Sequence, residues 1–271
     1  RIAGVSAITR AFATNPLKLL TPRARGPAVW AFLASFGGGY VAGDQTRFDV
    51  RMDPETRCYI GTQASTKIYR NPRGQPCGHQ TRAQVGEGGL LVFAPDSVQP
   101  FADATYDQLQ QFHLAPGAGL VLIDWLSSGR GECGEQWAFR RFHSRNEIWL
   151  TSAPAHPVIV DSLLLDGTAA QDGLRRQLGR YQCLALLLLT GPPLAESAAR
   201  LLEIVGHRPI SRHATLIASA SPVSGGALLR VAGAGVEAVR HELHHHLSFL
   251  PTLLGGDPWS RNGGASPQHN P

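Results

Sequence analysis

The fold is decided by residues 36–70, which read FGGGYVAGDQTRFDVRMDPETRCYIGTQASTKIYR. The glycines at 37–39 accept positive φ and close backbone contacts, so they predict a sharp turn before the next segment. From residue 46 to residue 52, apolar and charged side chains alternate with the period of two that is typical of a half-buried strand. We therefore expect a strand after this turn. The glycines assigned to the turn are Gly37, Gly38, Gly39 and Gly43.

A second, more polar segment follows. A turn at residues 53–56 leads to a return strand through Cys58 and Ile60, which predicts a hairpin with residues 46–52. The chain then continues as a predicted strand over residues 62–69, TQASTKIY. One face of this strand is rich in hydrogen-bonding groups: Gln63, Ser65, Lys67 and Tyr69.

The pair of motifs GGGYVAGD at residues 37–44 and TQASTKIYR at residues 62–70 resembles the urease accessory protein D family (UreD). One position departs from the family pattern, because Gly61 stands where we expect the first of two threonines. The resemblance covers roughly half of the chain and fades after about Asp166. Other segments agree in the same order: NPLKLL at 15–20, PFA at 100–102, Tyr106, Asp124, Gly129, Arg130, Gly134, Glu135 and Phe139.

The resemblance implies a non-enzymatic maturation factor, a scaffold in the insertion of nickel into urease. The implied partners are the urease apoprotein, the F-type urease accessory protein and the G-type GTPase accessory protein. Nickel is expected as cargo in transit, without a tightly bound cofactor. The sequence has no GxxxxGK[ST] phosphate loop, so GTP hydrolysis is assigned to another chain.

The resemblance also implies an internal passage in which carboxylates bind nickel weakly and release it. The residue types leave other roles open. Asp44 and Asp124 lie beside turns, where a carboxylate commonly accepts backbone N–H groups. Gln63 also fits an exposed sheet face, and Arg130 fits an ion pair with an internal carboxylate or with a partner. The candidates for the passage or an interface are Asp44, Gln63, Thr66, Lys67, Tyr69, Asp124, Arg130 and Glu135.

Composition favours a globular protein that is mainly β. Apolar residues make up 43% of the 271 positions and charged residues 17%, and 30 glycines with 19 prolines favour turns over long helices. The net charge is +5, but the arginines are scattered, so no nucleic-acid partner is expected. The longest apolar run, residues 183–189, is too short to span a membrane. Four cysteines without CxxC spacing favour reduced thiols and a cytoplasmic location.

The first region, residues 1–166, is expected to form a β-rich body. Its short alternating strands and tight turns predict an irregular β-helical or stacked-sheet arrangement. Two more hairpins are expected, one over residues 83–93 and one between residues 104–114 and 120–125.

The second region, residues 167–254, is expected to be a small α+β part that packs on the body and forms one structural unit with it. Apolar periodicity predicts two helices, at 193–205 and 235–254. Residues 255–271 are rich in Gly, Pro, Ser and Asn, which predicts a flexible tail.

The last predicted helix contains His241-Glu242-x-x-His245, the pattern of zinc metalloproteases. The alternative function is therefore a zinc-dependent hydrolase. On a helical wheel, however, His241 and His245 lie opposite the buried stripe that contains Leu243. We expect a solvent-exposed face on which His241, His244 and His245 bind nickel or zinc only adventitiously.

Overall fold

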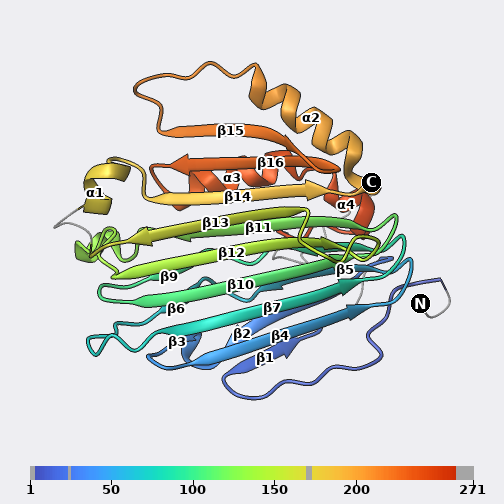
Figure 1. Cartoon of the computed structure of the whole chain (residues 1–271), viewed down its shortest axis with the longest axis horizontal. Helices are drawn as coiled ribbons and strands as arrows, with labels where there is room; N and C mark the ends of the chain where they lie inside the picture. The colour runs from blue at the N-terminus through green and yellow to red at the C-terminus, as the bar shows by residue number, and fades with distance from the viewer. Residues whose placement is uncertain (1–3, 24–25, 169–172, 261–271) are drawn as a thin grey trace, which may run out of the picture.

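The computed structural model describes residues 4–23, 26–168 and 173–260, and its core is a pair of stacked β-sheets (Figure 1). The larger sheet has the order β1 (Leu17–Leu20), β2 (Val29–Ser35), β5 (Arg57–Thr62), β8 (Leu90–Phe93), β11 (Gly119–Ser127), β14 (Cys183–Thr190), β16 (Gly226–Gly233) and β15 (Leu216–Val223). Three short strands lie beside this path: β3 (Gly39–Tyr40), β6 (Thr66–Ile68) and β9 (Val98–Pro100). The smaller sheet has the order β13 (Ile159–Asp166), β12 (Arg141–Leu150), β10 (Thr105–Leu114), β7 (Cys77–Val85) and β4 (Gln45–Met52).

The chain alternates between the two sheets. The turns after β4, β7 and β10 each lead to a strand of the larger sheet, and strands of successive coils pair in parallel, as β5 does with β2 and β8. The turns stack as well, because the N–H of Glu55 donates to the Glu87 carbonyl at 2.8 Å and that of Gly88 donates to the Pro116 carbonyl at 3.1 Å. The expectation of a mainly β, irregular β-helical stack is confirmed.

The three predicted hairpins are wrong. The strand at residues 46–52 does not pair with β5, residues 83–93 divide between β7 and β8 in different sheets, and β10 does not pair with β11. Alternation of side chains marks a half-buried strand whether the next strand is its neighbour or lies in the opposite sheet. The pattern therefore identified the strands but not their partners.

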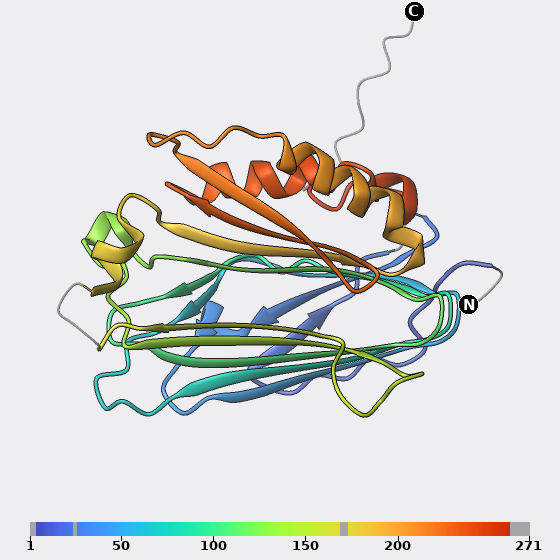
Figure 2. The ribbon, with the colours of Figure 1, turned by 45° about the horizontal axis from the view of Figure 1, so that its top comes forward.

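The helices lie mainly on the outer face of the larger sheet, where α2 (Ala195–Gly206) and α3 (Val236–His246) cover β14, β16 and β15 (Figure 2). The expected helix at 193–205 is confirmed as α2 with the short turn before it. The expected helix at 235–254 is divided, because α3 ends at His246 and α4 (Leu250–Leu254) begins four residues later. Pro251 explains the division, since a proline ring collides with the carbonyl four residues earlier in a continuous helix. A further short helix, α1 (Gly173–Leu178), precedes β14, and none of the helices in the described ranges is long and apolar enough to cross a bilayer.

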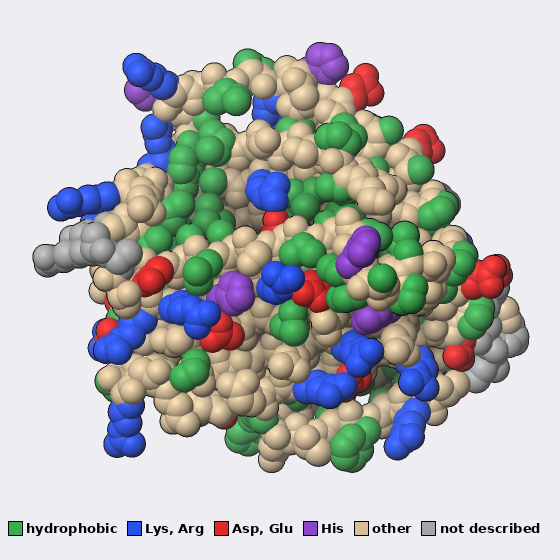
Figure 3. All heavy atoms as spheres, viewed as in Figure 1, with side chains coloured by type: hydrophobic (Ala, Val, Ile, Leu, Met, Phe, Trp, Pro, Cys, Tyr) green, Lys and Arg blue, Asp and Glu red, His purple; other side chains and the backbone are tan. Residues whose placement is uncertain are grey.

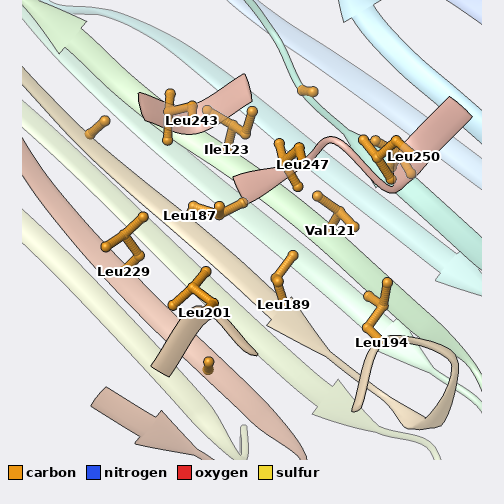
Figure 4. Packing of buried hydrophobic residues seen from close by; sticks show 14 of the residues in the cluster. Val121, Ile123, Leu187, Leu189, Leu194, Leu201, Leu229, Leu243, Leu247 and Leu250 are labelled. Atoms are coloured by element: carbon orange, nitrogen blue, oxygen red, sulfur yellow. The ribbon is translucent and has the colours of Figure 1, made fainter. Parts of the chain in front are cut away.

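Two apolar layers hold these elements together. Between the sheets, buried side chains such as Phe112 and Leu122 from opposite sheets pack together. On the outer face, Leu187, Leu189 and Leu229 pack against the helices (Figure 4). Because β14 pairs antiparallel with β11, the strands beyond residue 167 extend the larger sheet. The tail expected at 255–271 lies outside the described residues from 261 onward.

We predict that Leu189→Ala lowers the free energy of unfolding by about 2–5 kcal/mol, because it leaves a cavity at a fully buried position. Leu164→Ala is the matched control, since that leucine is 56% exposed and its truncation should cost no more than about 0.5 kcal/mol. Urea unfolding followed by tryptophan fluorescence measures both. Equal losses for the two variants would contradict the assigned packing.

Candidate functional site

A break in the larger sheet lies at the second motif, residues 62–69. β5 ends at Thr62 and β6 begins at Thr66. Beside them, β8 ends at Phe93 and β9 begins at Val98, so the two interruptions lie next to each other. The expected continuous polar strand over 62–69 is therefore wrong: residues 63–65 form a bend. The motif shapes the edge of an opening in the sheet.

Side-chain oxygens replace the backbone ladder at this break. The Thr62 hydroxyl accepts the Asp96 N–H at 2.7 Å, and the hydroxyls of Ser65 and Ser97 lie 3.4 Å apart. Backbone bonds hold the rim, since the N–H of Thr66 donates to the Ser97 carbonyl at 3.2 Å. These bonds satisfy polar groups that the interrupted ladder leaves without partners.

Asp124 lies beside the break on β11, the strand that spans it. β11 pairs with β8 up to Leu122 and with β9 at Leu126, so Asp124 falls between the two contacts. Its side chain accepts three hydrogen bonds from the opposite sheet. The donors are Gln108 Nε2 at 3.1 Å, Ser144 Oγ at 2.5 Å and Asn146 Nδ2 at 2.8 Å.

Burial raises the pKa of Asp124, although the hydrogen bonds from Ser144, Asn146 and Gln108 oppose this effect. The nearby carboxylate of Asp161 adds to the increase. All three bound donors are neutral. Within the described part of the chain, Asp124 is therefore a carboxyl group without an ion pair, held between the sheets at the level of the break.

A cavity of about 100 Å³, lined by both polar and apolar side chains, lies behind the break. Sequence reasoning missed His79 in its wall. The imidazole is buried, with Nδ1 2.7 Å from the Thr46 hydroxyl and Nε2 3.1 Å from the Thr81 hydroxyl, and burial lowers its pKa to about 4. The ring is thus neutral near pH 7. The cavity is lined by residues that include Tyr40, Gln63, Thr66, His79, Tyr106, Gln108, Gln110 and Asp124.

Two larger spaces adjoin this cavity. An outer hollow of about 980 Å³, beside α3 and Trp125, shares Thr62, Gln63 and Asp96 with it. A groove of about 390 Å³ between β13 and β16 shares Asp124. Each of the two larger spaces therefore shares part of its wall with the cavity.

The structure divides the predicted site residues into groups. Gln63, Thr66 and Asp124 line the inner cavity. Asp44 lies elsewhere, where its carboxylate accepts the Val41 N–H at 2.9 Å and closes the glycine turn. Lys67 is exposed on β6.

Tyr69, Arg130 and Glu135 gather around Phe101. Arg130 lies over the Phe101 ring, with its guanidinium carbon 4.4 Å from the ring centroid, and Tyr69 contacts the same ring edge to face. Glu135 accepts hydrogen bonds from Arg130 and Arg70, and this pairing holds the pKa of the Glu135 carboxyl at about 2. These residues form an ion-paired cluster around Phe101 that is not part of the cavity lining.

The glycine turn is also in place, with Gly37 and Gly38 at φ of 75° and 77°. Gly43 shares this conformation at φ 85°. Gly39 has extended backbone, and its requirement is space: a Cβ there would lie 2.1 Å from the Lys67 carbonyl oxygen.

The histidine-rich helix does not assemble the alternative site. His241 and His245 are exposed, and Glu242 pairs with Arg208 at 2.7 Å and with the buried His246 at 2.9 Å. His244 stacks on a tryptophan near the C-terminal end of the described chain. Across the described ranges, no group of three or more His, Cys, Asp or Glu side chains is placed to hold a metal ion.

Comparison with known proteins adds a family relationship. The sequence model described as "UreD urease accessory protein" matches residues 1–262. The chain is 44% identical to a urease accessory protein UreD of Sorangium cellulosum, over 96% of this chain and 81% of that protein. It is 39% identical to the UreD of an Anaeromyxobacter species, over 96% and 86%. It is 33% identical to urease accessory protein D of Oryza sativa subsp. indica, over 96% and 92%.

We predict that Asp124→Asn gains stability relative to the wild type as the pH rises from 4 to 7. Because the folded-state pKa of Asp124 is raised, ionisation costs folded-state stability only above the unfolded pKa of about 3.9. Below that value the Asp124 carboxyl group is protonated in both the folded and the unfolded state, so its ionisation costs no stability. Urea unfolding of both proteins at several pH values measures the difference. A difference that moves in favour of the wild type with rising pH would contradict the raised pKa.

Proposed function

Because the chain belongs to the UreD family of urease accessory proteins, we propose that it is a non-catalytic scaffold that binds apo-urease and conducts nickel toward the urease active site. Membership of the family supports a role in urease maturation. The finer assignment rests on one observation: the Asp124 cavity lies behind the break in the larger sheet and shares lining residues with two larger spaces.

The lining of the cavity favours passage over storage. A nickel ion beside Asp124 meets a single carboxylate, whose oxygens accept the hydroxyl of Ser144 and the amide N–H groups of Gln108 and Asn146. Oxygen ligands hold nickel less tightly than thiolate or imidazole ligands do. The raised pKa of Asp124 adds competition from protons, so a bound ion leaves readily.

The softer potential ligands nearby, the Cys77 thiol and the His79 imidazole, are poorly available to bind a metal ion. Burial raises the pKa of the Cys77 thiol to about 12, so it does not offer a thiolate at neutral pH. Both ring nitrogens of His79 lie within hydrogen-bonding distance of threonine hydroxyls. A strong nickel trap is thereby avoided along the proposed route.

The proposed partners are the urease apoprotein, the F-type accessory protein and the G-type GTPase, which supplies the nucleotide hydrolysis that this sequence has no phosphate loop to perform. We place the chain in the cytoplasm without a resident cofactor. The four free cysteines, Cys58, Cys77, Cys133 and Cys183, fit a reducing compartment.

Co-expression tests the proposal directly. The tagged chain is produced with the urease subunits and accessory proteins of its source, and pull-down, nickel content and urease activity are measured with and without it. Co-purification with apo-urease and loss of activation when the chain is omitted are expected. Full activation without the chain would refute the scaffold role.

We predict that Asp124→Ala lowers urease activation by at least about tenfold, a loss typical of removing a metal-binding group. His241→Ala is the control and should activate like the wild type, because this histidine is exposed on α3 and away from the cavity. Activation is measured as urease activity per molecule of co-purified chain, which separates conduction from assembly. Unchanged activation by Asp124→Ala would remove this residue from the route.

A further inference from the structure

β13 leaves one edge of the smaller sheet open, since its pairing partner in the described chain is β12 alone. The Gly167 N–H donates to the Arg140 carbonyl at 2.8 Å, which fixes the alternation of the antiparallel ladder. In that alternation, residues 161, 163 and 165 direct their peptide groups toward β12. Val160, Ser162 and Leu164 direct theirs toward the open edge.

The two edges of this sheet differ in chemistry. β4, the opposite edge, carries the exposed charges Arg47, Asp49 and Arg51, which discourage pairing with another chain. β13 instead presents Val160, 45% exposed, and Leu164, 56% exposed. An edge with free peptide groups and apolar side chains is a template for an added strand.

A groove runs along this open edge. It has a volume of about 390 Å³, and its floor includes apolar side chains of β14 and β16, among them Leu184, Leu186 and Ala232. Hydrophobic side chains gather on this side of the molecule (Figure 3). Ile210 in the groove wall is 85% exposed and Ile217 is 37% exposed, so the groove leaves apolar surface in contact with water.

An ion pair spans the groove and restricts which side chains of a partner can bind there. Arg230 of β16 reaches Asp161 of β13, and its side chain remains 60% exposed, whereas that of Asp161 is 14% exposed. Arginine has five N–H donors, so the guanidinium retains donors for a second carboxylate. The groove therefore complements an apolar segment that also carries an acidic residue.

We propose that β13 is the docking edge for a partner protein, which adds an extended segment to it as a new strand, places alternate apolar side chains in the groove and pairs a carboxylate with Arg230. The choice of partner rests on the proposed function: it is one of the proteins that assemble with this chain during urease maturation. The groove also adjoins Asp124, so the added strand lies at one end of the inner cavity.

Hydrogen exchange of the full chain, alone and in the complex with apo-urease and the accessory proteins of its source, tests the proposal. The amides of Val160, Ser162 and Leu164 should exchange roughly tenfold or more slowly in the complex, because the added strand accepts their hydrogen bonds. Ser162→Pro removes one of these donors without removing a bond to β12, and it should weaken assembly. Ser162→Ala, which keeps the N–H, should assemble normally, and Arg230→Gln should also weaken assembly.

The outcomes separate this inference from the proposed function. A complex that forms and activates urease while residues 160–164 exchange as in the free chain would overturn the docking edge and leave the scaffold role intact. Normal assembly of Ser162→Pro would do the same. If these amides in the isolated chain become better protected as the protein concentration rises, two copies of the chain pair through β13. That result would overturn the docking of a different protein. Absence of any complex with the wild-type chain would overturn both proposals.

Discussion

Parallel hydrogen bonding between successive coils of the chain is the constraint on which the rest of the structure depends. Two parallel strands cannot be joined by a tight turn, so the chain must travel elsewhere before it returns beside its previous coil. Here it returns through a second sheet, and the two sheets bury the apolar faces of each other's strands. The same constraint aligns the break. An interruption after Thr62 in β5 is matched by one after Phe93 in β8, and the opening between the strands extends across two coils.

The strands that hold the larger sheet together across this break define the site. β11 continues past it without interruption and places Asp124 there, while β10 and β12 supply amide and hydroxyl groups from the opposite sheet. These donors satisfy a carboxyl group that would otherwise be costly to bury. The carboxyl group of the candidate site is therefore held in the interior of the stack, and the bend after β5 adds Gln63 to the cavity wall.

Much of the fold could be predicted from the sequence, because side-chain alternation and apolar runs are local. The strands β4, β10 and β11 and the helix α2 lie close to the predicted ranges. Strand partners could not be predicted, since a turn such as residues 53–56 serves a hairpin or a crossover equally well. The site was accessible only in part. Asp124 and Gln63 came from family resemblance, whereas the hydrogen-bond partners of Asp124 are 16 to 22 residues away in sequence. One local signal existed: Gln108 and Gln110, and Ser144 and Asn146, are polar pairs at the inward positions of two strands.

The lone carboxyl group of Asp124 has a consequence for metal choice in the proposed role. A carboxylate beside a hydroxyl accepts many divalent cations, and the Cys77 thiol and the His79 imidazole, which would favour late transition metals, are protonated or hydrogen-bonded. A conduit of this kind transmits the ion it is given. Discrimination between nickel and zinc then belongs to the protein that loads the conduit and to the urease site that receives the ion, and cellular supply of the correct metal becomes a condition for faithful maturation.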